Sequence, residues 1–149
     1  MPKKRIRVLI VEDHNPTACL IKQAFGEKCA NVEWDHCFAK DGEEALDCLF
    51  KRGEHAEAAL PDFILLDWNL PKVSGRDVLR MLKGSDELRA IPVLIFSASQ
   101  AEDDVRAAYN AHANGFISKP IDLDSLYAII ESIEMFWVHT VRLPAKEVA

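Results

Sequence analysis

Several features that would assign a chain to a particular class are missing from these 149 residues. No apolar run approaches the roughly 18 residues of a membrane-spanning helix. Only five apolar residues follow in the basic start of the chain and the strand after it, which is too few for a signal peptide. We therefore expect a cytoplasmic protein that does not enter a membrane.

Metal-binding and dinucleotide-binding signatures are also missing. The cysteines are Cys19, Cys29, Cys37 and Cys48, and no C-x-x-C occurs among them. A zinc site is therefore not expected, and we interpret the four as free, mostly buried thiols. No G-x-G-x-x-G follows the first expected strand, which argues against a dinucleotide-binding domain.

Positive charge is scarce relative to negative charge. The formal net charge is -6, and the main basic cluster is Lys3-Lys4-Arg5 with Arg7. Binding a phosphate backbone requires clustered Lys and Arg, so we expect no nucleic-acid partner. Hydrophobic residues at 49% and charged residues at 28% are typical of a folded domain, and the length suits one.

Apolar runs and helix signals alternate along the chain. Strands are expected at 6–11, 32–38, 63–66, 91–96 and 115–118, and helices at 16–25, 41–53, 76–83, from 102, and at 123–137. This alternation predicts an α/β fold, with a parallel sheet covered by helices on both faces. Residues 54–60 either extend a helix or form a loop.

Polar residues follow four of the expected strands. They are Glu12, Asp13, Asp67, Ser97 and Lys119. The carboxyl ends of parallel strands share one edge, where α/β proteins place their ligands. Each residue alone could be a cap, a loop hydroxyl or a solvated charge, but their convergence predicts one shared site.

The residue types at this edge suit phosphoryl chemistry. Three carboxylates held together repel one another unless a cation intervenes, and Mg²⁺ prefers oxygen ligands. Lys119 adds a positive charge and Ser97 a hydroxyl. Together they could hold a phosphoryl group on a carboxylate.

These residues occur in a pattern that resembles a known family, the receiver domains of two-component response regulators. The shared marks are Glu12-Asp13, Leu65-Leu66-Asp67 with Leu70-Pro71 and Gly75, Ser97 after Phe96, and Lys119-Pro120 after Phe116. The resemblance covers 5–137, which leaves a lead-in at 1–4 and a tail at 138–149. It implies a flavodoxin-like (βα)5 fold with strand order 2-1-3-4-5.

The resemblance implies a role for each matching residue at the acceptor. Asp67 would accept a phosphoryl group from a phosphohistidine of a sensor histidine kinase. Glu12, Asp13 and Asp67, with the backbone carbonyl of Asn69, would bind Mg²⁺.

It also implies the parts of a switch. Ser97 and Phe116 would be the switch residues, and Lys119 would pair with the phosphoryl oxygens. A cis peptide bond is expected before Pro120. Phe116 has no tyrosine hydroxyl, so packing alone would drive its rotation.

Two further expectations concern length. The separation between Asp13 and Asp67 is longer than usual in the family, which places an insertion near 53–61, away from the site. No output domain follows the receiver, so output would pass through a surface.

The carboxyl-terminal region supplies a candidate for that surface, because the last helix carries more apolar residues than one stripe requires. A homodimer is expected through helix four, strand five and helix five, extended by the tail. Its proposed surface comprises Ile129, Phe136, Trp137, Val141 and Leu143. The alternative is that the tail folds back over its own domain. The aromatic-rich end is similar to that of receivers partnering cyanobacterial phytochromes.

The expected function is that of a signalling switch, which is not an enzyme. Two alternative functions remain open. Phosphatases of the haloacid dehalogenase type also use a strand-end aspartate with Mg²⁺, but they need an acid two positions later, where this chain has Asn69. The other alternative is a receiver-like interaction module that accepts no phosphate.

Overall fold

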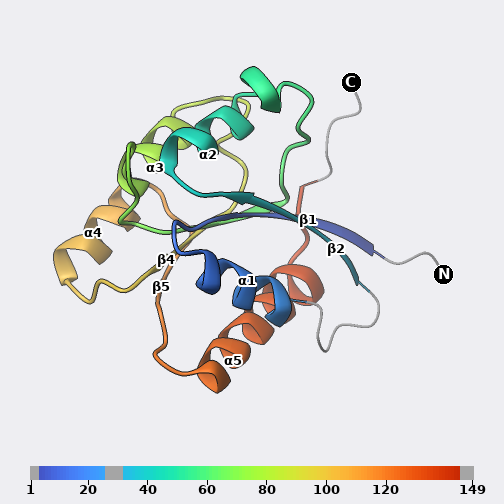
Figure 1. Cartoon of the computed structure of the whole chain (residues 1–149), viewed down its shortest axis with the longest axis vertical. Coiled ribbons are helices and arrows are strands. Elements are labelled where there is room, and N and C mark those ends of the chain that lie inside the picture. Colours follow the sequence, from blue (N-terminus) through green and yellow to red (C-terminus); the bar gives the residue numbers. More distant parts are fainter. Residues whose placement is uncertain (1–3, 26–31, 145–149) are drawn as a thin grey trace.

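Five parallel strands form the centre of the molecule (Figure 1). The computed structural model describes residues 4–25 and 32–144. The strands are β1 (Lys4–Val11), β2 (Val32–Ala39), β3 (Phe63–Leu66), β4 (Val93–Ser97) and β5 (Gly115–Ser118). Their order is β2-β1-β3-β4-β5, and every neighbouring pair is parallel. The predicted fold class and strand order are confirmed.

Helices cover both faces of the sheet. They are α1 (Asn15–Ala24), α2 (Gly42–Leu49), α3 (Gly75–Lys83), α4 (Glu102–Asn110) and α5 (Leu123–Glu134). In Figure 1, α2, α3 and α4 lie on one side of the sheet, and α1 and α5 lie on the other. Asp41, Ser74 and Asp122 each accept a hydrogen bond from a backbone N–H in the first turn of α2, α3 and α5. These caps fix where each helix leaves its loop.

The two helical layers explain why the central strands are apolar throughout. All four residues of β3 are buried, as are all five of β4. Leu9, Ile64 and Leu66 pack in the core with α2 and α3, whereas Val8, Phe63 and Leu65 pack with α1 and α5. Because alternate residues face opposite layers, each strand contributes to two cores.

The extra residues before β3 form a short 3₁₀ turn, η1 (Gly53–His55), followed by irregular chain. This outcome resolves the choice that the sequence left open. At the end of the segment, Asp62 accepts a hydrogen bond from the backbone N–H of Arg7 at 2.8 Å, and its own N–H donates to the Arg7 carbonyl at 2.7 Å. Arg7 lies near the start of β1, so the extra length is at the edge opposite the strand ends that hold the expected site.

The last helix differs from its expected form, because α5 ends at Glu134 and a π-helix, η2 (Met135–Thr140), follows. Val138 is buried, and the Lys4 ammonium donates to its carbonyl oxygen at 3.1 Å. Trp137 and Leu143 pack against the core cluster under α1 and α5. The described part of the tail therefore folds back on its own domain, while residues 145–149 of the predicted tail lie outside the described residues.

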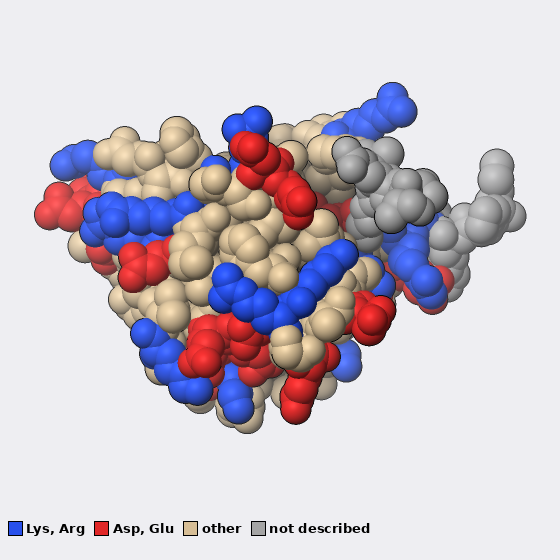
Figure 2. All heavy atoms as spheres, turned by 90° about the horizontal axis from the view of Figure 1, so that it is seen from above, with Lys and Arg blue, Asp and Glu red and all other residues tan. Residues whose placement is uncertain are grey.

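Neither the described helices nor the surface charge points to a membrane. Over the described ranges, no helix combines the length and hydropathy that crossing a membrane requires. On the face shown in Figure 2, basic side chains lie among acidic ones.

The cysteines differ in part from the expected buried thiols. Cys37 and Cys48 are half-buried, but Cys19 is exposed, so the prediction is wrong for that residue. Cys19 lies on α1 outside the buried stripe of Ala18, Ile21 and Ala24. Cys29 lies outside the described residues.

Cys48 is expected to react slowly with alkylating reagents. Burial, with a smaller contribution from Glu44, raises the pKa of its thiol to about 11 from 9.0. The higher pKa lowers the thiolate fraction, and the greater nucleophilicity of the more basic thiolate offsets about half of that effect. Peptide mass spectrometry after a brief iodoacetamide pulse should show modification of Cys48 about tenfold slower than of an ordinary thiol, and later than of Cys19. Equal rates at Cys48 and Cys19 would contradict this expectation.

Candidate functional site

The predicted site residues meet at the carboxyl edge of the sheet. β1 and β3 are neighbours in register, with Val11 beside Leu66, so the residues that follow each strand emerge side by side. The Asp67 N–H continues the ladder by donating to the Val11 carbonyl at 3.1 Å. The sheet thus places Asp67 next to Glu12 and Asp13.

Three carboxylates form a compact acidic cluster. One oxygen from each of Glu12, Asp13 and Asp67 can be chosen so that all three atoms lie within 4.8 Å of one another. Glu12 and Asp67 are buried, while Asp13 is exposed. Burial raises the pKa of Glu12, and the neighbouring Asp67 charge adds to the rise. This set of hard oxygen donors fits a divalent cation.

Lys119 supplies the counter-charge within the protein itself. Its Nζ lies 2.8 Å from Glu12 Oε2 and 3.0 Å from Asp67 Oδ2. Burial alone would lower the pKa of the ammonium, but the hydrogen bonds to Glu12 and Asp67 outweigh that effect and raise it. Lys119 is therefore charged at neutral pH and supplies a positive charge to two buried carboxylates.

The loop after Asp67 folds tightly over the acceptor. The Asn69 N–H donates to Asp67 Oδ1 at 3.2 Å, and the Gly75 N–H donates to the Trp68 carbonyl at 3.0 Å. Gly75 lies so close that a Cβ on it would be 2.1 Å from the Asp67 carbonyl oxygen. The two Asp67 oxygens thus have different partners, Asn69 for one and Lys119 for the other.

Ser97 and Phe116 lie on the strands next along the sheet. Ser97 is fully buried at the end of β4, and its Oγ accepts from the Ser99 N–H at 3.1 Å. Its carbonyl accepts from the Lys119 N–H at 2.8 Å, which ties β4 to the residue that contacts Asp67. Phe116, on β5, is half-buried against the core under α2, α3 and α4.

The predicted cis peptide bond before Pro120 is not observed. No peptide bond in the described part of the chain is cis, so that expectation is wrong for this structure. The trans form is the ordinary preference even before proline, by about 0.5–1 kcal/mol.

Two residues at the site were not recognised from the sequence in the roles they have. From the sequence, Gly75 was only part of the family motif; in the structure, its missing side chain allows the backbone of Asp67 to lie against it. Ser99 joins the site to α4, because its Oγ donates to Asp104 and also accepts from the Ala101 N–H at 3.3 Å. The spacing of Ser99 and Glu102 is that of a capping box, but α4 begins at Glu102 with Ala101 as its N-cap, so this signal would have placed the helix start two residues early.

With the fold and this site in view, comparison with known proteins identifies the class. The sequence profile of the response regulator receiver domain matches residues 8–131, so the chain belongs to the response regulator receiver family. Receiver domains are phosphorylation-dependent switches of two-component signalling. No comparison supports the alternative of a phosphatase of the haloacid dehalogenase type.

Individual relatives are similar over almost the whole chain. Response regulator Rcp1 of Synechocystis sp. is 37% identical over 138 residues, which is 93% of this chain and 92% of that protein. The Mn²⁺-bound form of Rcp1 has a TM-score of 0.88 at 36% identity and covers 94% of this chain and 99% of that one. The phosphorylated cyanobacterial phytochrome response regulator RcpA has a TM-score of 0.88 at 39% identity and covers 95% and 99%. The acidic cluster and the Mn²⁺-bound relative together support binding of a divalent cation.

Proposed function

We propose that this chain receives a phosphoryl group on Asp67 from a phosphohistidine of a sensor histidine kinase. The observation that carries this proposal is the pairing of Asp67 with one ammonium and two further carboxylates at the strand edge. An oxygen of Asp67 would be the nucleophile, with the Lys119 ammonium held 3.0 Å from the same carboxylate. The proposal includes no turnover of a separate substrate, so the chain would not be an enzyme.

The transfer would exchange one bond to phosphorus for another. A carboxylate oxygen of Asp67 attacks the phosphorus, the P–N bond to the imidazole breaks, and the imidazole leaves with the electron pair and takes up a proton. Lys119, which contacts Asp67, would bind the phosphoryl oxygens, and Ser97 at the end of the neighbouring strand would bond another of them. Both would stabilise charge on the phosphoryl group.

The metal ion at this site would be Mg²⁺. Glu12, Asp13 and Asp67, with the backbone carbonyl of Asn69, would hold it, and it would neutralise negative charge on the transferred group. The donors are all hard oxygens, which suits an ion that keeps several waters and binds through few carboxylates. The Mn²⁺-bound form of Rcp1 supports a divalent ion here without selecting this one.

A groove beside Lys119 suits the approach of the kinase. It has a volume of about 250 Å³, and its lining includes Leu20, Pro120, Ile121 and Leu123. Leu20, Ile121 and Leu123 are exposed apolar side chains, which usually mark an interface. A partner seated there would reach Asp67 from the side of Lys119. Because RcpA is described as a phytochrome response regulator, we propose a phytochrome kinase, met in the cytoplasm.

Phosphorylation would act by shifting a population between two surfaces. Ser97 would move toward the phosphoryl group, Phe116 would fill the space released, and the face of α4, β5 and α5 would change. Ser99 links this site to the start of α4 through its hydrogen bond to Asp104, which supports a change that reaches α4. The size of the population shift is set by the difference in free energy with which the phosphoryl group interacts with the two states.

The experiment for phosphoryl acceptance is labelling with a small phosphodonor and Mg²⁺, read by intact-protein mass spectrometry. The parent should gain one phosphoryl mass, and it should gain none in EDTA or as Asp67→Asn. Asp41→Asn is the matched control, because Asp41 is also buried but caps α2 instead of joining the acidic cluster. Equal labelling of the parent and Asp67→Asn would refute Asp67 as the acceptor.

We also propose a homodimer through α4, β5, α5 and the adjoining π-helix. Of the predicted contact residues, Ile129, Trp137 and Leu143 pack partly on the chain's own core, and Val141 is half-buried. Phe136 remains 50% exposed and neighbours Met135, which is 59% exposed. These two side chains therefore add exposed apolar surface to this proposed contact, beside Tyr109 on α4 and Leu123 on α5.

The dimer is tested by removing that exposed apolar surface without touching the buried tail. Sedimentation equilibrium of Met135→Ser/Phe136→Ser should show at least about tenfold weaker self-association than the parent, because two large apolar contacts are lost. Met81→Ser is the control, since Met81 is 43% exposed on α3. A double variant that associates as strongly as the parent would exclude this surface.

A further inference from the structure

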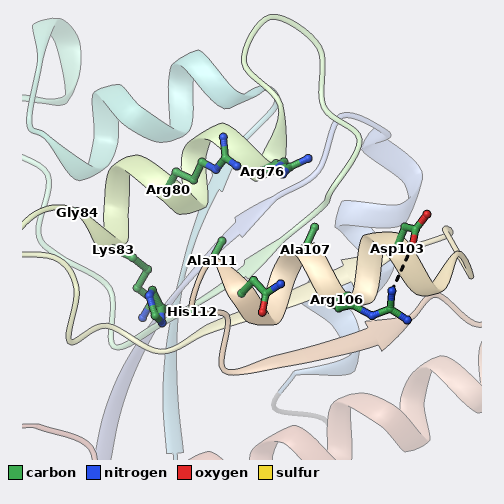
Figure 3. A pocket seen from close by; sticks show the side chains of 10 residues that line it. Arg76, Arg80, Lys83, Gly84, Asp103, Arg106, Ala107, Ala111 and His112 are labelled. Atoms are coloured by element: carbon green, nitrogen blue, oxygen red, sulfur yellow. Dashed lines mark ion pairs between the residues drawn. The ribbon is translucent and has the colours of Figure 1, made fainter.

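A basic groove lies between α3 and α4, on the side of the sheet away from α1 and α5 (Figure 3). Its volume is about 590 Å³, and four of its lining residues are Arg76, Arg80 and Lys83 from α3 and Arg106 from α4. The acidic residue in its lining is Asp103. The groove is therefore locally positive in a chain whose net charge is -6.

Two of these arginines have side chains without an ionic or hydrogen-bonding partner among the described residues. Arg76 and Arg80 are four residues apart on α3 and exposed, so they share one face of the helix. Throughout the described ranges, neither guanidinium forms a salt bridge or a hydrogen bond. Like charges at this spacing repel, so folding gains nothing from the pair.

Lys83 and Arg106, the other two cations of the groove, both have partners within the protein, but Lys83 is held more firmly than Arg106. The Lys83 ammonium donates to the carbonyls of Arg89 at 3.0 Å and Ile91 at 2.9 Å and to Asn114 Oδ1 at 3.3 Å, so it is occupied by the loops around it. Arg106 lies 3.5 Å from Asp103, and both side chains are largely exposed. Such an exposed pair contributes little and can exchange for another carboxylate.

Two small apolar side chains form the floor of the groove. Ala107 on α4 and Ala111, which caps the end of that helix, line the groove and pack partly against the core under α2, α3 and α4. A small apolar floor beneath exposed arginines leaves room for a side chain from outside. Arginine is also enriched in the buried parts of protein interfaces, where it binds carboxylates through two parallel hydrogen bonds.

We infer that this groove binds an acidic segment of a partner protein, with carboxylates on Arg76, Arg80 and Arg106 and an apolar side chain over Ala107 and Ala111. Charge complementarity selects this occupant, because the groove concentrates unpaired positive charge on an otherwise acidic molecule. A small anion would satisfy the guanidiniums but would leave the apolar floor uncovered. Phosphoryl acceptance at Asp67 is not required for this binding.

The experiment selects ligands without assuming a partner. The full chain, biotinylated at its amino terminus, is used to select from a random peptide library displayed on phage, and selected peptides are then measured by fluorescence anisotropy. We expect acidic peptides whose affinity falls at least about tenfold for Arg76→Gln/Arg80→Gln, since two charge-assisted contacts are lost. Affinity should also fall as the salt concentration rises.

The control removes two exposed arginines elsewhere. Arg5→Gln/Arg142→Gln should bind the selected peptides as the parent does, because both side chains lie outside the groove. Thermal unfolding of both double variants checks that each is folded, which is expected because all four positions are exposed.

Four results would overturn the inference. Selected peptides could lack an acidic bias, or could bind Arg76→Gln/Arg80→Gln as tightly as the parent. Inorganic tripolyphosphate could bind through the same arginines while no acidic peptide is selected, which would make this a small-anion site. Sedimentation could show that the parent self-associates and Arg76→Gln/Arg80→Gln does not, which would assign the groove to a second copy of this chain.

Discussion

Lys119→Met is expected to lower the free energy of unfolding by about 3 kcal/mol, which is the low end of the cost of breaking a buried ion pair. The side chains of Glu12 and Asp67 are only 3% and 7% exposed, and Lys119 contacts both at 3.0 Å or less. Without the ammonium, two buried carboxylates lose their counter-charge. Urea unfolding of the variant and the parent measures the difference.

Mg²⁺ should restore much of this stability. A cation among the three carboxylates replaces the charge that Lys119 supplied, and the substitution removes an ammonium that would repel the ion. The gain in stability on adding Mg²⁺ should therefore be larger for Lys119→Met than for the parent. Ca²⁺-free and Mg²⁺-free buffers provide the baseline for both proteins.

The matched control removes a charge from an exposed pair. Arg5 lies 3.4 Å from Glu33, and both side chains are more than half exposed. Arg5→Met should change stability by less than about 1 kcal/mol and should leave the response to Mg²⁺ unchanged. Equal losses in the two variants, or equal Mg²⁺ responses in Lys119→Met and the parent, would show that Lys119 does not neutralise the acidic cluster.

Gly75→Ala is expected to cost about 3 kcal/mol and to weaken Mg²⁺ binding. A Cβ at this position would lie 2.1 Å from the Asp67 carbonyl oxygen and 2.8 Å from the Trp68 Cα. These neighbours are backbone atoms, so the chain beside the acceptor has to move to relieve the overlap. Overpacking of this kind costs typically 1–3 kcal/mol, and here it also displaces the loop that carries Asn69.

Gly84→Ala separates the effect of this contact from a general effect of losing glycine. Gly84 caps the end of α3 with a φ of -81°, and its nearest neighbour to an added Cβ is the Arg80 carbonyl oxygen at 3.2 Å. Its substitution should change stability by less than about 1 kcal/mol. Urea unfolding and a Mg²⁺ titration of both variants test the pair, and a Gly75→Ala protein as stable as Gly84→Ala would contradict the close approach.

Strand and helix order could be predicted because the core imposes it on local sequence. The runs at 63–66 and 91–96 are apolar because helices cover both faces of β3 and β4. The polar residues after β1, β3, β4 and β5 could be brought to one edge by topology alone. The contacts of Lys119 with Glu12 and Asp67 follow from that placement, although their distances do not.

Features that depend on distant packing could not be predicted in the same way. The end of α5 reads as apolar on several sides, and the sequence does not distinguish an exposed patch from a tail folded on its own core. Val138 and Leu143 are held by contacts with residues far away in the chain, including Lys4. The exposure of Cys19 and the groove beside Arg76 likewise depend on which helix face meets which neighbour.

The most direct measurement of the central claim locates the phosphoryl group within the chain. After labelling with a phosphodonor and Mg²⁺, borohydride reduces an aspartyl phosphate to homoserine, and proteolysis with mass spectrometry identifies the modified residue. We expect homoserine at position 67 in the labelled parent and none without phosphodonor or in Asp67→Asn. Homoserine at position 13 or another acidic residue, or a stable label that borohydride does not reduce, would contradict Asp67 as the phosphoacceptor.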